Sequence, residues 1–218
     1  MAALEMTVVS TAMPTVIGDL GGIQHYSWVF TAYLLASTVT VPLYGKLADL
    51  YGRKPIMLFG IALFLIGSAA SGVSRSMTQL IVFRTIQGLG AGSMQPIALT
   101  IAGDIFELEE RSRIQGIFGA VWGVAGLIGP MVGGLIVRYL SWHWVFYINV
   151  PFGIASAALL LVGLHEKVAR KSHAIDWWGA VLLASGVLAL LASSHGGPFA
   201  VVWLALAIAL LAAFIWVE

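Results

Sequence analysis

Residues 199–217 read FAVVWLALAIALLAAFIWV, an unbroken apolar run without a charged side chain. A helix needs about 20 predominantly apolar residues to cross the hydrocarbon core of a membrane, whereas a spanning strand needs about 9–11 residues of alternating polarity. This run does not alternate, and it is long enough for a helix. It therefore predicts a membrane-spanning helix.

Similar apolar runs occur along the whole chain, and short stretches rich in glycine or charged residues separate them. Short connections predict that neighbouring spans pack antiparallel. The fold class expected is an all-α integral membrane protein with eight spans. The other seven lie at about 1–17, 27–45, 55–74, 77–102, 112–137, 144–164 and 177–193.

The composition agrees with a membrane protein. Of 218 residues, 60% are hydrophobic and 10% are charged, against about 45–50% and about 25% in soluble domains. This excludes an ordinary soluble enzyme or a disordered chain, and the lack of cysteine excludes a disulfide framework. The net charge of +1 gives no sign of nucleic-acid binding. The histidines lack the spacing of a metal site, and we expect neither a metal, a cofactor nor an enzymatic activity.

The basic residues predict the orientation. Arginine and lysine are enriched in the cytoplasmic loops of membrane proteins. With eight spans, only Arg75 and Arg138 fall on one side. The opposite side, with the N-terminus, should therefore be cytoplasmic. Its basic residues are Lys46, Arg53, Lys54, Arg111, Arg113, Lys167, Arg170 and Lys171.

A weak internal repeat links the second and fifth spans. Because three helices separate the two copies, the repeated unit inverts across the membrane, as in many transporters. The first six spans are therefore expected to form a 3+3 inverted repeat. Pro42, Gly45, Leu47 and Tyr51 recur in the same order and spacing as Pro130, Gly133, Leu135 and Tyr139.

Two charged residues lie inside apolar spans. Arg84 shares one helical face with Gln87 and Gln95, and an arginine at such a depth usually faces a bundle interior or a wet cavity. The alternative is that Arg84 reaches the outer interface. Glu5 is the other charge, and it could bind a proton in a low-dielectric site or lie at the cytoplasmic interface if the chain begins at Met1.

Glycines form two further patterns. Seven glycines of the fifth span (116, 119, 123, 126, 129, 133 and 134), with Pro130, share one face and predict close helix packing or a sliding interface. The segment 45–55 is expected to be a loop with Gly45 and Gly52 at turns. Within it, Asp49 and Arg53 can pair across a helical turn, although an ordinary cytoplasmic loop explains their presence too.

Five stretches resemble signatures of the major facilitator superfamily. Residues 45–54 resemble the signature between helices 2 and 3, residues 80–92 that of helix 4, and residues 129–134 the helix 5 signature of antiporters. Residues 4–14 and 142–151 resemble the fourteen-span drug:proton antiporters. The chain departs from the usual signatures at Leu50, Ala125, Glu5 and Ser10, where these families usually carry a basic residue, glycine, aspartate and asparagine.

The resemblance implies a role for each candidate residue. Arg84 would couple proton and substrate movement, with Glu5 as its partner. Gln87 and Gln95 are expected in the substrate cavity because they share the helical face of Arg84. A cytoplasmic charge latch would comprise Asp49, Arg53 and Asp104, with Gly45, Gly52 and Lys54, and closure would depend on Gly129, Pro130, Gly133 and Gly134.

The resemblance also implies an organisation. Residues 1–165 would be the six-helix N-terminal half of a transporter with a shortened first helix, 166–176 a cytoplasmic linker, and 177–218 two additional transmembrane helices. A missing C-terminal half, or a second copy, would be needed to enclose a cavity. The expected function is proton-coupled efflux of small hydrophobic or cationic compounds across a plasma membrane, such as a bacterial inner membrane, with the proton gradient as energy source. An uptake carrier on the same fold, or a non-transporting half-length subunit, are the alternatives.

Overall fold

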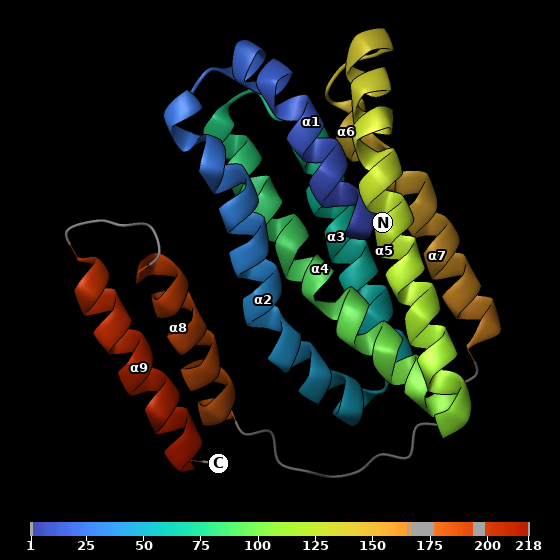
Figure 1. Cartoon of the computed structure of the whole chain (residues 1–218), viewed down its shortest axis with the longest axis vertical. Coiled ribbons are helices and arrows are strands. Elements are labelled where there is room, and N and C mark those ends of the chain that lie inside the picture. The colour runs from blue at the N-terminus through green and yellow to red at the C-terminus, as the bar shows by residue number, and fades with distance from the viewer. Residues whose placement is uncertain (1, 165, 167–176, 194–198, 218) are drawn as a thin grey trace.

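The computed structural model describes residues 2–164, 166, 177–193 and 199–217, and every regular element in these ranges is helical (Figure 1). The helices are α1 (Ala2–Leu20), the 3-10 helix η1 (Ile23–His25), α2 (Tyr26–Tyr51), α3 (Arg53–Gly72), α4 (Met77–Ile105), α5 (Leu108–Tyr139), α6 (Trp144–Tyr147), α7 (Asn149–Gly163), α8 (Trp177–Ser193) and α9 (Ala200–Val217).

Most helices extend beyond the expected apolar spans. The expectation of a loop from Gly45 is wrong, because α2 continues through Gly45 to Tyr51 and the turn is made at Gly52 alone, with φ of +98°. The first helix passes Gly18 and ends at Leu20, before Gly21 and Gly22 with positive φ. A single glycine with an ordinary φ weakens a helix without ending it, whereas a left-handed glycine reverses the chain.

The expected span at 144–164 is divided in two. The α-helical pattern is interrupted at Ile148, between α6 and α7. Trp144–Gly163 is nevertheless long and apolar enough to cross a membrane, as are Ile23–Tyr51, Arg53–Gly72 and Leu108–Tyr139. Among the described helices, α8 and α9 contain shorter apolar stretches, while α1 and α4 carry the buried Glu5 and Arg84.

One pair of helix contacts fits the expected inverted repeat. Helix α4 packs along α2 and α3, α1 packs along α5, α3 packs on α7, and α8 pairs with α9 (Figure 1). If α1 to α3 correspond to the three spans that begin with α4, the α1–α5 contact is the counterpart of the α4–α2 contact. This pair of contacts therefore agrees with the expected 3+3 architecture, whereas the extensive α3–α4 contact has only a small counterpart between α1 and α6.

Both of these contacts use a threonine against a glycine. A Cβ atom on Gly129 would lie 1.9 Å from the Oγ1 of Thr7, and one on Gly92 would lie 2.1 Å from the Oγ1 of Thr40. Each threonine hydroxyl also donates a hydrogen bond of 3.4 Å to a backbone carbonyl of the opposite helix. Small residues let helix backbones approach closely in membranes, and both of these crossings join a helix of one repeat to a helix of the other.

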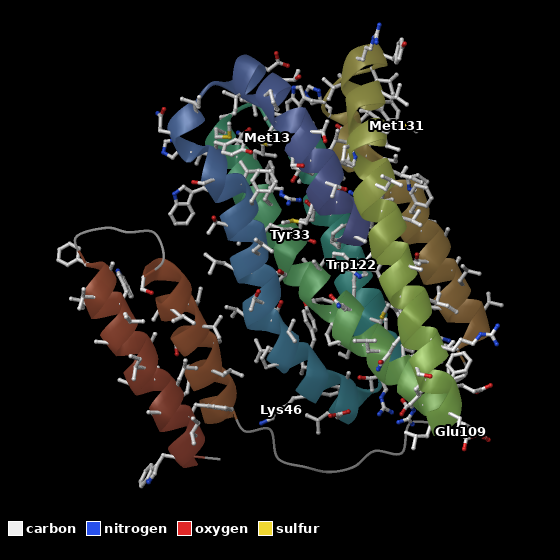
Figure 2. All side chains as sticks on the ribbon, in the orientation of Figure 1. Met13, Tyr33, Lys46, Glu109, Trp122 and Met131 are labelled. Atoms are coloured by element: carbon white, nitrogen blue, oxygen red, sulfur yellow. The ribbon has the colours of Figure 1, made fainter. Side chains whose placement is uncertain are left out.

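The labelled side chains in Figure 2 show which helix ends lie together. Lys46 on α2 and Glu109 on α5 lie at the lower end in Figure 2, whereas Met13 and Met131 lie toward the opposite end. Apart from Glu166, the expected linker 166–176 lies outside the described residues, and so do its basic residues Lys167, Arg170 and Lys171.

Candidate functional site

The centre of the bundle contains a buried ion pair between Glu5 of α1 and Arg84 of α4. Their side chains are 1% and 0% exposed, and the Nη1 of Arg84 donates to the Oε1 of Glu5. Arg84 also donates to the Oε1 of Gln87 over 2.7 Å and, through Nε, to the carbonyl of Val29 over 3.3 Å. Neither charged group lies at an interface, because each is enclosed by protein.

Aromatic rings cover the guanidinium group of Arg84. Its Cζ lies 4.2 Å from the ring centre of Tyr33 and 5.9 Å from that of Phe146. A cation over an aromatic face is attracted by the negative charge above the ring, most strongly where water is excluded. Tyr33 and Phe146 therefore replace part of the hydration that Arg84 loses on burial.

Asn149 completes the coordination of Glu5, and sequence reasoning did not find it. Its Nδ2 donates to the Oε2 of Glu5 and, over 3.1 Å, to the Oγ of Ser68. Ser68 in turn donates over 2.8 Å to the carbonyl of Phe146. Both carboxylate oxygens of Glu5 are thus held, by α4 and by α7. The available signal was that Asn149 is the single asparagine of the chain and lies in an apolar span.

A cavity of about 580 Å³ lies beside this network. Gln95 lines it, whereas Gln87 is not among its lining residues and is fully buried as the partner of Arg84. The wall is mostly apolar and comes from α1, α2, α4, α5 and α8. It includes Met6, Tyr33, Leu34, Val41, Leu99, Trp122, Leu183 and Val187, with Ser37 and Thr38.

The residues of the expected charge latch gather around Arg53 at the start of α3. Its guanidinium nitrogens lie 3.2 Å from a carboxylate oxygen of Asp104 and 3.9 Å from one of Asp49. Sequence reasoning missed a third acid, Glu166, at 3.9 Å. The side chain of Glu166 is 15% exposed, against 71% for Asp49, so it is the least hydrated of the three acids.

Glu166 and Lys54 cap each other's helices. The carboxylate of Glu166 accepts the backbone N–H groups of Arg53 and Lys54 at 2.9 and 3.0 Å, at the N-terminus of α3. The Nζ of Lys54 donates to the carbonyls of Leu161 and Leu164, both at 2.8 Å, at the end of α7. Backbone N–H groups at a helix N-terminus and carbonyl groups at a helix C-terminus have no hydrogen-bond partner within the helix. The N–H groups attract negative charge and the carbonyl groups attract positive charge. The exchange fastens α3 to α7.

Replacing Glu166 with alanine is expected to lower the free energy of unfolding by about 1–2 kcal/mol, because the N-terminus of α3 loses an anionic cap. Asp49→Ala is the matched control, and its expected effect is below about 0.5 kcal/mol, since the lost ion pair is exposed. Denaturant titration of the purified chain in detergent measures both. Equal losses in the two variants would contradict the assignment of Glu166 as the cap.

The glycines of α5 do not share one packing role. Cβ atoms on Gly129 and Gly133 would collide with Thr7 and with the carbonyl of Val8 on α1. In contrast, a Cβ on Gly134 would meet nothing within 4 Å. Within the described residues, only Gly129 and Gly133 of the stripe therefore pack closely against another helix. Pro130 is exposed within a continuous helix, and open space also surrounds Gly116, Gly119, Gly123 and Gly126.

The sequence matches those of known proteins. A sequence model of the Major Facilitator Superfamily matches residues 1–217. The chain is 44% identical over 191 residues to Multidrug resistance protein 3 of Bacillus subtilis (strain 168), covering 88% of this chain and 37% of that protein. It is 46% identical over 197 residues to Multidrug transporter protein MdtP of the same organism, covering 90% and 36%.

The fold also matches a solved structure. The crystal structure of an auto-inhibited POT family peptide transporter superimposes with a TM-score of 0.63 at 17% identity, over 98% of this chain and 49% of that one. The chain thus spans little more than a third of the two Bacillus relatives' length. The family match covers nearly the whole helical bundle, and the chain belongs to the Major Facilitator Superfamily of membrane transporters.

Proposed function

We propose that the chain forms the N-terminal half and two additional helices of a secondary active transporter that exports small hydrophobic or cationic compounds in exchange for protons. The observation that carries the proposal is the buried Glu5–Arg84 pair beside an apolar cavity. The names of the two Bacillus relatives support drug-like compounds as substrates.

The pair provides a chemical basis for exchange. When Glu5 binds a proton, Arg84 becomes the uncompensated charge beside the cavity, which disfavours a cationic compound there. When Glu5 releases the proton, the pair is neutral again and a cation is tolerated. Proton and cation therefore exclude one another, and this is the condition for moving them in opposite directions.

The cavity favours apolar compounds. Its wall consists mainly of aliphatic and aromatic side chains, with Gln95 as an uncharged hydrogen-bonding group. Such pockets bind through apolar contact and use a few polar groups for orientation. A second half, or a second copy, would supply the remaining wall. The lengths of the relatives support a longer polypeptide.

The proposed location is the plasma membrane, which in a Gram-negative bacterial host is the inner membrane. The N-terminus and the basic loops would face the cytoplasm. Lys46 lies at the end of the bundle that this orientation directs inward (Figure 2). Arg53 and Lys54 begin the next helix, just after the end of α2 that carries Lys46, as expected from the enrichment of basic residues on the cytoplasmic side.

Dye transport in everted membrane vesicles tests the function. The 218-residue chain, and the longest open reading frame that contains it, would be expressed separately and supplied with ethidium under an imposed proton gradient. We expect accumulation that a protonophore abolishes and that Glu5→Gln prevents, with Arg138→Ala as the control. Accumulation in right-side-out vesicles instead would indicate an uptake carrier, and no movement by either product would indicate a non-transporting subunit.

A further inference from the structure

Tyr33 belongs to both the buried network and the cavity. Its ring lies 4.2 Å from the guanidinium carbon of Arg84, and the same residue lines the cavity. Only 4% of its surface is exposed. The ring therefore stands between the ion pair and the space in which a compound would bind.

Two hydrogen-bond donors behind this ring have no partner. Within the described residues, the Nη2 of Arg84 and the Nε2 of Gln87 are buried and make no hydrogen bond. These atoms belong to two side chains that are joined by the 2.7 Å bond from Nη1 to Oε1. Buried donors in folded proteins are nearly always satisfied, often by an ordered water.

The missing acceptor should be uncharged. Glu5 already balances the charge of Arg84, so that a second anion would leave a net charge in a region without bulk water. A water molecule supplies two lone pairs and can accept from both donors. The chemistry of the unpaired donors thus favours water.

The backbone around Tyr33 is fixed. A Cβ on Gly88 would lie 2.4 Å from the carbonyl oxygen of Tyr33 and 2.9 Å from the Cβ of Ala36, so α2 and α4 are in close contact at this level. A passage cannot open here by separation of the two helices without breaking that contact. The mobile part is the side chain, which can rotate about χ1.

We propose that the ring of Tyr33 is a gate through which water passes from the cavity to an acceptor position at Arg84 and Gln87. In the proposed transport function, this water would carry protons to and from Glu5. That use of the water, but not the gate itself, rests on the proposed function. With the ring over Arg84, the pair is sealed from the cavity. With the ring turned away, water reaches the donors.

Cysteine labelling tests the gate, because the chain contains no cysteine of its own. Ser68→Cys places a thiol in the hydrogen-bond network of Glu5, at a fully buried residue that is bonded to Asn149. Mass spectrometry on the purified chain measures the rate at which methyl methanethiosulfonate modifies this cysteine. The rate is compared in three backgrounds, with the native Tyr33, with Tyr33→Phe and with Tyr33→Ala. We expect Tyr33→Ala to raise the rate about tenfold or more, since modification no longer requires a packed ring to open.

Tyr33→Phe keeps the ring and should retain the slow rate. Ser93→Cys is the matched control, because Ser93 is equally buried but faces Gly60 of α3. Its rate should be the same with all three residues at position 33. Equal rates at Ser68→Cys in all backgrounds, or an equal rise at both cysteines, would overturn the gate. Labelling involves no transport, so this result is independent of the efflux measurement.

Discussion

Replacing Arg84 with alanine is expected to lower the free energy of unfolding by about 3–5 kcal/mol and to abolish proton-driven dye export. The variant leaves the carboxylate of Glu5 buried without its counter-ion, which costs far more than the net contribution of the intact pair. Denaturant titration in detergent measures the stability, and the vesicle assay measures the export.

A charge-neutral variant separates stability from coupling. Glu5→Gln combined with Arg84→Gln removes both charges, so most of the lost stability should return while export remains absent. Arg138→Ala is the single-arginine control, because Arg138 is exposed on α5 and packs on Tyr139. Export by Arg84→Ala at the wild-type rate would contradict the coupling role, whatever the stability of the variant.

Sequence reasoning found Glu5 and Arg84 one by one from the apolar runs around them, and only the family resemblance joined them as partners. Each is a charge within an apolar run, and that signal is local. Their contact with Asn149 and Tyr33 depends on how α1, α2, α4 and α7 pack. The free-energy cost of placing a tyrosine or an asparagine in a span is much smaller than that of a charge, so neither residue marks a site by itself. The charges were therefore predictable, whereas the groups that hold them were not.

The charge cluster around Arg53 shows the same division. Asp49 and Arg53 are four residues apart on successive helical turns, and this proximity is visible in the sequence. Glu166 and Lys54 cap helices that are distant in sequence, and only the packing of α3 on α7 brings them together. Helix capping between distant segments has no local pattern that could reveal it.

The helices themselves followed from apolar runs, but their ends did not. An apolar run measures the part of a helix that crosses the hydrocarbon core, whereas α5 has 32 residues and, at about 1.5 Å per residue, is close to 48 Å long. The polar ends of such helices lie beyond the core and carry ordinary helix-forming residues. For this reason the segment from Gly45 to Tyr51 resembles a loop in the sequence and is helical in the structure.

Gly90→Ala is expected to lower the free energy of unfolding by about 3 kcal/mol, at the upper end of the usual cost of overpacking. The new Cβ would lie 2.3 Å from the backbone nitrogen of Phe64 and 2.5 Å from the carbonyl oxygen of Gly60. Backbone atoms cannot rotate away, so α3 and α4 must separate. Ser68 lies on α3 and Arg84 on α4, so the same shift should also reduce export.

Gly126→Ala is the matched control, because a Cβ at this position of α5 meets nothing within 4 Å. Alanine is the better helix former by up to about 1 kcal/mol, so this variant should be as stable as the wild type or slightly more stable. The glycine-rich stripe of α5 attracts attention in the sequence, yet the α3–α4 interface has the closer backbone approach. Equal destabilisation by Gly90→Ala and Gly126→Ala in denaturant titration would show that glycine content, rather than backbone approach, determines the cost.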